Sequence, residues 1–352
     1  MLDVGIERDP HLGASSARRA AVSAAALMAK ASHGDALQMK NTFLIVGPTA
    51  VGKTSLGIEL AELFDAEIIN ADAFQIYHGL DILTAKPDSE TQRQVRHHLL
   101  GQVSLAERMS AVSFGELACA ALADIHSRNK NALIAGGSGL YLKAITHGFD
   151  KVPPPDPRLR EELSALSLEE LGLRLRDLNP QLAARTDLKN PRRVIRAIEI
   201  AAATAVIPSE VEGSRNVILK LSQRDPSTDA RDDEFAVAGV LVLRDRDDLY
   251  QRINERVNAM FREGVEEEVR ALQDIGPTAS NALGLKEIRA LIEGQISRAE
   301  CIGKIQQATR RYAKRQLTWF RHQTTFPQLN LTPFSHREAV CAITRMFRRA
   351  EE

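Results

Sequence analysis

The chain has 352 residues, of which 44% are hydrophobic and 26% are charged, a composition typical of globular proteins. Lys and Arg together number 46, as do Asp and Glu, so the net charge alone predicts neither a nucleic-acid nor a membrane partner. The cysteines Cys119, Cys301 and Cys341 lie far apart, which excludes a disulfide scaffold or a zinc module and favours a reducing cytoplasm. No run of about 18 apolar residues is present, so we expect no membrane span.

The first forty residues are rich in Ala and Ser and contain a few Arg, a composition close to that of some targeting segments. They lack the continuous apolar stretch of a secretory signal, and acidic residues interrupt them. We therefore expect residues 1–40 to be a disordered N-terminal extension, with Met39 as an alternative start of the chain.

Short apolar stretches alternate with helical patterns between residues 41 and 135. The strand-like stretches are Asn41–Val46, Glu67–Asn70 and Asn131–Ala135, and apolar residues at helical spacing mark Ser55–Phe64 and Phe114–Arg128. An alternation of this kind predicts an α/β fold with a mostly parallel sheet.

Prolines mark the next boundary, because VPPPDP at Val152–Pro157 continues neither a helix nor a central strand. A charged helical pattern follows as far as Ala203, whereas residues 205–227 show little pattern. A strand is predicted at Val237–Leu243, and mainly helices after it. We therefore expect a core domain, a helical insertion, and a C-terminal helix or tail, at 41–155 with 228–335, 156–227, and 336–352 respectively.

The first predicted strand runs into GPTAVGKT, which matches the phosphate-loop pattern GxxxxGK[ST]. Glycines in such a loop let backbone N–H groups face an anion, and the following helix adds its positive N-terminal end. The lysine reaches the terminal phosphate, and the threonine hydroxyl holds Mg²⁺. The predicted phosphate-binding residues, the last of them also the metal ligand, are Gly47, Pro48, Thr49, Ala50, Val51, Gly52, Lys53 and Thr54.

The loop alone leaves the identity of the bound phosphate compound open. Nucleotide kinases and NTPases are its usual users, and they need a further carboxylate on Mg²⁺ after another strand. Asp72, just after the strand at Glu67–Asn70, is the obvious candidate. Its position fits either a metal-associated carboxylate or a catalytic base.

Five further blocks resemble the tRNA dimethylallyltransferase family. ADAFQIYHGLDILTAKP is similar to that family's SADSxQIYxGMDIGTAKP, GGSGLYLKA to its GGTGLYLKA, and NPRRVIRAIEI to its NDPRRVxRALEV. LYQRINERVNAMFREGVEEEVRAL and TRRYAKRQLTWFR match two more family blocks. In chain order the five are Ala71–Pro87, Gly136–Ala144, Asn190–Ile200, Leu249–Leu272 and Thr309–Arg321.

The resemblance implies a core like that of phosphate-loop NTPases, with a small inserted helical domain. Members of the family transfer a dimethylallyl group from its diphosphate to the exocyclic amine of an adenosine beside the anticodon, in tRNAs that read codons beginning with U. We therefore expect dimethylallyl diphosphate and the anticodon stem-loop of tRNA as partners, Mg²⁺ as cofactor, and a cytoplasmic monomer. No Cys/His cluster lies near the C-terminus, which indicates the bacterial type without a zinc finger.

The same resemblance assigns residue roles block by block. Asp72 would be the general base on the adenine amine, with Ser138 and Arg256 beside the reacting groups. A carboxylate within hydrogen-bond reach takes the amine proton as attack develops, and the leaving diphosphate needs fixed donors. The residues expected to contact tRNA are Asp72, Ala73, Phe74, Gln75, Ser138, Arg160, Arg192, Arg193, Val194, Ile195 and Arg196.

Some candidate residues have two interpretations. Thr309–Arg321 carries five basic residues and no acidic one, which favours contacts with RNA phosphates, although a solvated face is the alternative. Tyr77 is expected either to stack on a base or to pack in the core. His97 and His98 resemble part of a family block, and we expect both to be structural.

Several positions depart from the family pattern. Ala73 stands where the family has Ser, Leu83 where it has Gly, Gly101 where it has Asp, and Leu285 where it has Tyr. None of these changes removes a residue of the predicted chemistry. We therefore expect catalytic turnover to be retained, whereas the affinity for tRNA is predicted less firmly.

Two other functions stay open. An adenylate isopentenyltransferase would use a free nucleotide as the acceptor, and a small-molecule kinase or NTPase would transfer or hydrolyse a phosphate. The basic blocks and the helical insertion favour tRNA over a free nucleotide, and we find no separate base-binding motif for a kinase.

Overall fold

The computed structural model describes residues 41–148, 156–205 and 238–351. These residues divide into two compact units, one made of 41–148 with 238–351 and the other of 156–205. The N-terminal extension, most of the proline-rich boundary and the unpatterned residues 206–227 lie outside the described residues. The expectations for those segments, and the domain limits drawn through them, stay predictions.

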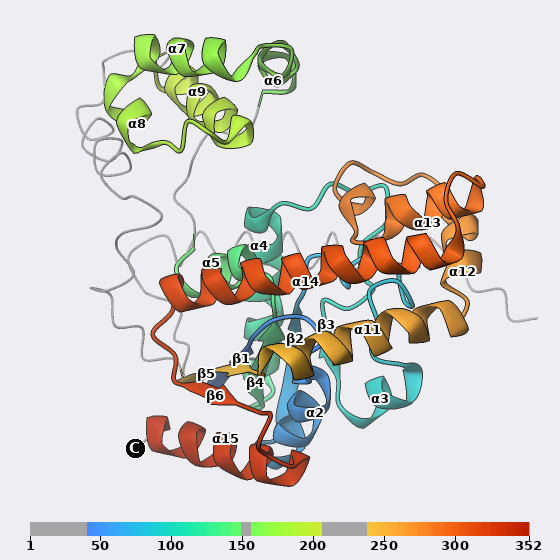
Figure 1. Cartoon of the computed structure of the whole chain (residues 1–352). Coiled ribbons are helices and arrows are strands. Elements are labelled where there is room, and N and C mark those ends of the chain that lie inside the picture. Colours follow the sequence, from blue (N-terminus) through green and yellow to red (C-terminus); the bar gives the residue numbers. More distant parts are fainter. Residues whose placement is uncertain (1–40, 149–155, 206–237, 352) are drawn as a thin grey trace, which may run out of the picture. The chain divides into compact units, whose positions relative to one another are not determined.

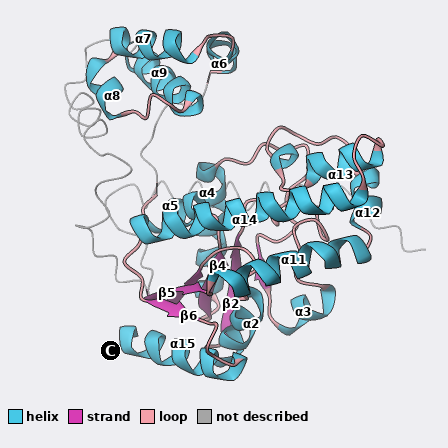
Figure 2. Cartoon of the chain, in the orientation of Figure 1, coloured by secondary structure: helices cyan, strands magenta, loops and turns pink. Residues whose placement is uncertain are grey.

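The larger unit is built on a parallel sheet whose order in the described residues is β3-β2-β4-β1-β5-β6. Figure 1 shows helices on both faces of this sheet, and Figure 2 separates the two kinds of element by colour. The predicted α/β fold is thereby confirmed. The strands are β1 (Thr42–Val46), β2 (Ala66–Ala71), β3 (His97–His98), β4 (Asn131–Gly136), β5 (Ala238–Leu243) and β6 (Gln328–Asn330).

Helices α2 and α15 pack on one face of the sheet, and α4, α5 and α14 lie on the other (Figure 1). The helices of the larger unit, with one short 3₁₀ helix, are α2 (Lys53–Leu63), α3 (Ser89–Gln94), α4 (Ala111–Ser127), α5 (Gly139–Thr146), α11 (Arg246–Arg262), α12 (Val265–Ala271), η1 (Ala279–Asn281), α13 (Leu285–Ile292), α14 (Arg298–Gln323) and α15 (His336–Glu351).

Strand β1 shows how a continuous apolar sequence fills both faces. Successive side chains of a strand point to opposite faces, so Phe43 and Ile45 join the core beneath α2 and α15. Leu44 and Val46 join the second core, beneath α4 and α5. All four are buried, as expected for a central strand of a parallel sheet covered on both sides.

Strands β3 and β6 were not predicted. They contain only two and three residues, which is too short for an alternating pattern to be detected. Both lie at the edges of the sheet, where pairing with one neighbour suffices. Tyr77, for which two roles were open, is fully buried in the core.

The smaller unit has a core of its own, which includes Leu163, Leu171, Leu175 and Ile198. Polar side chains fix the starts of its helices: Asp156, Ser167 and Asn179 each accept a hydrogen bond from a backbone N–H of the first turn. The helices are α6 (Pro157–Ser164), α7 (Leu168–Leu178), α8 (Pro180–Arg185) and α9 (Pro191–Ala205).

The described helices include none that is both long and apolar enough to cross a membrane. Cys119, Cys301 and Cys341 are all free thiols.

A charged network ties the edge of the sheet together. The Glu67 carboxylate on β2 accepts from His98 Nε2 at 2.6 Å and from Arg128 Nη2 at 2.8 Å. These bonds, with Arg128 the main cause, lower the pKa of the nearly buried Glu67 to about 2. His98 therefore has the structural role that was predicted for it.

We expect Glu67→Gln to destabilise the larger unit by roughly 2–4 kcal/mol at pH 7, because it leaves the buried His98 and the partly exposed Arg128 facing a neutral amide. The folded-state pKa is below the ordinary value of 4.5, so this stabilisation is present above pH 4.5 and is lost as the pH falls towards 2. Urea unfolding followed by the fluorescence of Trp319, the single tryptophan, measures it. Asp124→Asn, which removes only an exposed partner of Arg128, is the control; equal losses in both variants would contradict the prediction.

Candidate active site

The predicted phosphate loop joins the end of β1 to the start of α2. Gly52 directly precedes α2 with a φ of 105°, a conformation that favours glycine. A Cβ at Gly47 would stand 2.4 Å from the carbonyl oxygen of Val242 on β5, so only glycine fits. The loop therefore has the shape that lets backbone N–H groups gather at the N-terminus of a helix.

Lys53 is held by the loop itself. Its Nζ donates to the carbonyl oxygens of Gly47 at 2.9 Å and Pro48 at 2.7 Å. Burial lowers the pKa of Lys53 to about 8; the nearby Asp72 carboxylate opposes this shift, and the Arg256 guanidinium adds to it. These three charged groups are therefore close enough to influence one another.

Asp72 and Ser138 leave neighbouring strands at the same level. Ala71 of β2 pairs with Gly136 of β4, which in turn pairs with Val46 of β1. The turn after β2, the turn after β4 and the phosphate loop consequently begin side by side, at the carboxyl edge of the sheet.

Hydrogen bonds fix the geometry of the turn that carries Asp72. Its Oδ1 accepts from the N–H groups of Phe74 at 3.0 Å and Gln75 at 3.3 Å. Ser138 Oγ accepts from the N–H of Ala73 at 2.9 Å. The Ser138 hydroxyl and the Asp72 carboxylate thus belong to one connected turn.

Arg256 enters the site from α11. Its Nη1 donates to Thr49 Oγ1 at 2.9 Å, and its Nη2 donates to the carbonyl oxygen of Thr84 at 2.7 Å. Its Nε is buried without a hydrogen-bond partner among the described residues. Burial lowers the pKa of Arg256, while Asp72 opposes the shift; an arginine stays charged all the same.

The side-chain amide of Gln75 bonds the loop at Thr84 and Ala85 rather than facing solvent. Its Nε2 donates to the carbonyl oxygens of Thr84 at 3.0 Å and Ala85 at 3.2 Å. The segment that supports Arg256 is thereby tied to the segment that carries Asp72. Gln75, which was predicted to contact tRNA, has its amide N–H groups directed to this loop.

Helix α14 supplies groups that sequence reasoning did not assign to the site. Gln316 bonds both the phosphate loop and the turn before Ser138. Tyr312 lies near Ser138 and Gln316, and burial, followed by the nearby Asp72 charge, raises the pKa of Tyr312 to about 12. Both residues lie inside the family-like block Thr309–Arg321. They stand among basic residues in the sequence, and only the folded helix shows that they face the protein interior.

Two further arginines hold the outer side of the phosphate loop and were also missed. Arg244 Nε donates to the carbonyl oxygen of Val51 at 2.9 Å, and Arg252 Nε donates to that of Ala50 at 3.0 Å. The sequence indicates a role at the site only weakly, through the position of Arg252 four residues, or one helical turn, before Arg256.

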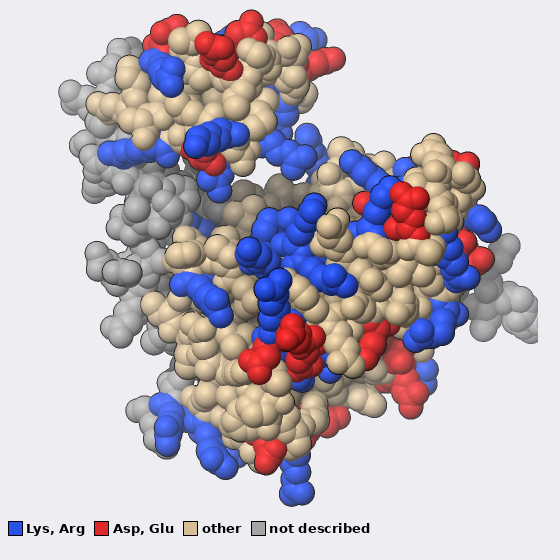
Figure 3. Space-filling view, in the orientation of Figure 1, with Lys and Arg blue, Asp and Glu red and all other residues tan. Residues whose placement is uncertain are grey.

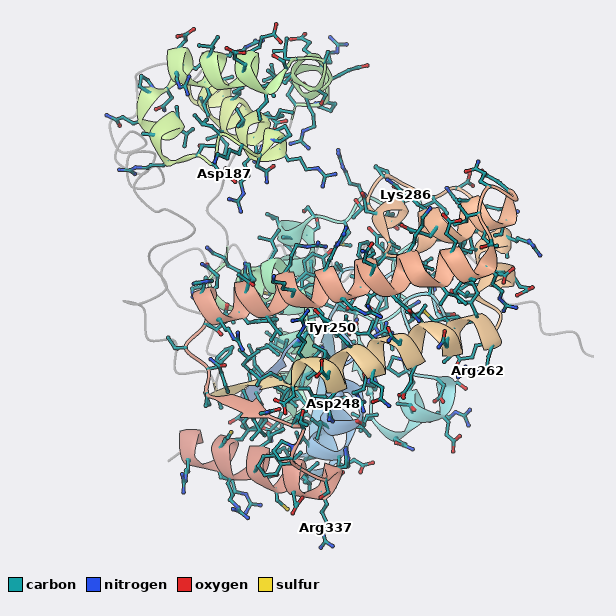
Figure 4. The ribbon with its side chains drawn as sticks, in the orientation of Figure 1. Asp187, Asp248, Tyr250, Arg262, Lys286 and Arg337 are labelled. Atoms are coloured by element: carbon teal, nitrogen blue, oxygen red, sulfur yellow. The ribbon has the colours of Figure 1, made fainter. Side chains whose placement is uncertain are left out.

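The basic residues of α14 divide into two groups. Arg310 turns inward: its Nη2 donates to Asn254 Oδ1 at 2.6 Å, and its guanidinium lies over the ring of Tyr250. Figure 4 labels Tyr250 between α11 and α14. The exposed basic residues of Thr309–Arg321 are Arg311, Lys314, Arg315 and Arg321, and Figure 3 shows Lys and Arg gathered on the face that α14 crosses.

The remaining residues predicted to contact tRNA lie in the smaller unit. Arg160 forms two bonds of 2.7 Å with the buried carboxylate of Glu199, and Arg196 adds a third at 3.0 Å. Val194 is fully buried in the core of that unit, so its side chain offers no surface to RNA. The prediction for Val194 therefore needs correction: its place in the pattern reflects packing.

The other residues of α9 differ in exposure. Arg192 and Arg193 are exposed, whereas Ile195 is partly buried against the same core as Val194. Two residues that depart from the family pattern, Leu83 and Leu285, are also packing residues, because both are buried in the second core, beneath α4 and α5.

Comparisons with known proteins show the family to which the chain belongs. The profile of the family described as IPP transferase matches residues 75–323. The tRNA dimethylallyltransferase of Exiguobacterium sp. is 42% identical over 81% of this chain and 89% of its own length. That of Geobacillus thermodenitrificans is 40% identical over 82% of this chain and 90% of its own length.

Solved structures give the same result. The full-length tRNA isopentenylpyrophosphate transferase of Bacillus halodurans superimposes with a TM-score of 0.61 at 31% identity, covering 88% of this chain and 97% of that one. A eukaryotic dimethylallyltransferase acting on tRNA has a TM-score of 0.65 at 22% identity, which shows the fold alone. From its phosphate loop, its sheet and these relatives, the chain belongs to the IPP transferase family.

Proposed function

We propose that this protein transfers the dimethylallyl group of dimethylallyl diphosphate to the exocyclic amine of adenosine 37 in tRNAs that read codons beginning with U. The carbon–oxygen bond to the diphosphate breaks, a carbon–nitrogen bond to adenine forms, and the amine loses a proton. The observation that carries this proposal is the placement of the phosphate loop and the Asp72 turn side by side at the carboxyl edge of the sheet, with Arg256 bonded to Thr49 of that loop.

Lys53 and Arg256 hold the diphosphate together with the loop N–H groups. As the bond to the dimethylallyl group breaks, negative charge grows on the diphosphate, and fixed cations stabilise that charge. Both cations are desolvated, which strengthens their effect because the surroundings screen it less than water would.

The donor set around the loop fits Mg²⁺. Among the described residues no group of three or more His, Cys, Asp or Glu side chains would hold a metal ion by itself. Mg²⁺ commonly takes only one or two protein oxygens and completes its shell with water and substrate phosphate. Thr54, exposed in the first turn of α2, would supply its hydroxyl, and the bound ion would neutralise charge on the leaving diphosphate.

Asp72 takes the proton of the adenine amine. The lone pair of this amine is delocalised into the ring, so removing its proton during attack assists the reaction by about 10²–10⁴-fold. The two backbone N–H groups on Oδ1 orient the carboxylate, and Ser138 fixes the turn from the other side.

The tRNA supplies an adenosine that must leave the base stack before a protein pocket can receive it. Exposed cations that would neutralise its phosphates are Arg311, Lys314 and Arg315 on α14, and Arg192 and Arg193 on α9. This assignment narrows the larger set predicted from the sequence, because Arg160 and Arg310 are engaged within the protein.

Labelled dimethylallyl diphosphate offered with tRNA, with AMP, or with both identifies the acceptor. We expect label in tRNA, none in AMP, and no requirement for ATP. Label appearing only in AMP would show an adenylate isopentenyltransferase. Hydrolysis of ATP without any prenyl transfer would instead favour the kinase or NTPase class.

Asp72→Asn keeps the size of the side chain and removes the base. We expect single-turnover transfer to tRNA to fall by about 10²–10⁴-fold, with tRNA binding in a filter assay within about threefold of the unchanged protein. Asp65→Asn is the matched control, because Asp65 directly precedes β2, is exposed and has a φ of 49° that asparagine tolerates. Near-normal transfer by Asp72→Asn would remove Asp72 as the base.

Lys53 makes the binding of dimethylallyl diphosphate sensitive to pH. Because its pKa is about 8, Lys53 loses its positive charge above that pH, and affinity should fall by up to about tenfold per pH unit. Calorimetric titrations between about pH 7 and about pH 9.5 measure this trend. Lys53→Met should bind weakly at every pH; an unchanged wild-type affinity across the range is the opposing result.

A further inference from the structure

Gln316 connects two loops of the site from the middle of α14. Its Oε1 accepts from the N–H of Thr49 at 2.9 Å, and its Nε2 donates to the carbonyl oxygen of Gly137 at 2.8 Å. The side chain is only 6% exposed. The fit is close, since a Cβ at Gly137 would stand 2.4 Å from Gln316 Nε2.

Thr49 is held from two directions by protein groups. Gln316 Oε1 accepts a hydrogen bond from the Thr49 N–H, and Arg256 Nη1 donates to the Thr49 hydroxyl at 2.9 Å. Both polar groups that Thr49 offers beside its carbonyl are thus engaged, which distinguishes it from a residue that simply faces the diphosphate. One of the two bonds that hold the Arg256 guanidinium is therefore made to a residue that Gln316 fixes; the other is made to the carbonyl oxygen of Thr84.

The second bond of Gln316 acts on the other side of the site. Gly137 immediately precedes Ser138, whose hydroxyl is joined to the turn of Asp72. Tyr312, one helical turn before Gln316, lies close enough to Ser138 and Gln316 for both to influence its pKa. One buried amide consequently joins the phosphate loop to the turn that carries Ser138, which is itself bonded to the turn of Asp72.

We propose that Gln316 is a positioning residue of the transfer reaction. It orients Arg256 through Thr49 and Ser138 through Gly137, and its own atoms touch neither substrate. This inference rests on the proposed prenyl transfer, but it concerns a residue outside the phosphate loop. It also removes Thr49 from the predicted ligands of the diphosphate, because Thr49 serves as the link between Gln316 and Arg256.

Helix α14 contributes to both of the proposed binding regions. The exposed cations Arg311, Lys314 and Arg315 lie on the same helix as Gln316. The helix that offers cations to tRNA is therefore the helix that fixes the loop for the diphosphate. A single rigid element carries both contacts.

Gln316→Met tests this role, because methionine has a similar length and forms neither bond. We expect kcat to fall by about 10–100-fold, since small displacements of catalytic groups have effects of that order. The dissociation constant of dimethylallyl diphosphate should rise, while that of tRNA stays within about threefold. Gln307→Met, the same change at an exposed position of α14, should match the unchanged protein.

A double-mutant cycle separates positioning from a general structural role. Thr49→Val keeps the N–H that Gln316 accepts and removes the hydroxyl that Arg256 contacts. If Gln316 acts through Thr49, the double variant should lose little more than the more impaired single variant. Losses that multiply would show that the two residues act independently and would overturn the assignment.

Gln316→Glu decides the matter if Gln316→Met does not fold. Glutamate has the same shape and still accepts the Thr49 N–H, but it repels the carbonyl oxygen of Gly137. Its loss of kcat should then be non-additive with that of Ser138→Ala. A folded Gln316 variant with wild-type kcat and wild-type affinity for the diphosphate contradicts the positioning role. A wild-type protein that transfers no dimethylallyl group contradicts the proposed function instead. In that case the diphosphate affinities of the variants still test the role of Gln316.

Discussion

The site depends on how closely backbone segments approach one another at the carboxyl edge of the sheet. A Cβ at Gly136 would stand 2.3 Å from the carbonyl oxygen of Ala71, one at Gly137 would stand 2.9 Å from that of Gly47, and one at Gly47 would meet β5. Distances this short exclude any side chain. Because these glycines allow the three turns to lie in contact, a cation, a carboxylate and a hydroxyl from distant parts of the sequence meet there.

The electrostatic balance of the site follows from that closeness. Two desolvated cations, Lys53 and Arg256, act on each other and on a single carboxylate, Asp72. Such an arrangement has an excess of positive charge before any substrate binds. A diphosphate would compensate this excess, whereas an uncharged ligand would leave two partly buried cations with one nearby carboxylate.

The sequence predicted the parts of the fold that have a repeating pattern. The strands beginning near Thr42, Ala66, Asn131 and Ala238, and the long helices, all have enough apolar residues to be recognised. The short strands β3 and β6 do not. The turns that carry Lys53 and Asp72 were predicted because their residue types are specific, and their spatial meeting follows from the parallel order of strands.

The supporting residues were harder to predict, for a physical reason. Gln316, Arg244 and Arg252 act through bonds to backbone carbonyl or N–H groups, and such bonds leave no pattern in the partner's sequence. Val194 shows the opposite error. It stands in a motif of basic residues, yet its neighbours in space are apolar, so its position in the motif indicated RNA when its burial indicates packing.

The carbonyl bonds that Arg244 and Arg252 make to the phosphate loop have a consequence for the order of events in a reaction cycle. A loop restrained before the substrate arrives loses little conformational entropy on binding, so affinity for a diphosphate is gained in advance. The same restraint acts on the diphosphate product, which carries the same oxygens and more charge once the dimethylallyl group has left. If the loop holds the diphosphate as proposed, a rigid cradle that favours entry also slows departure of the diphosphate product.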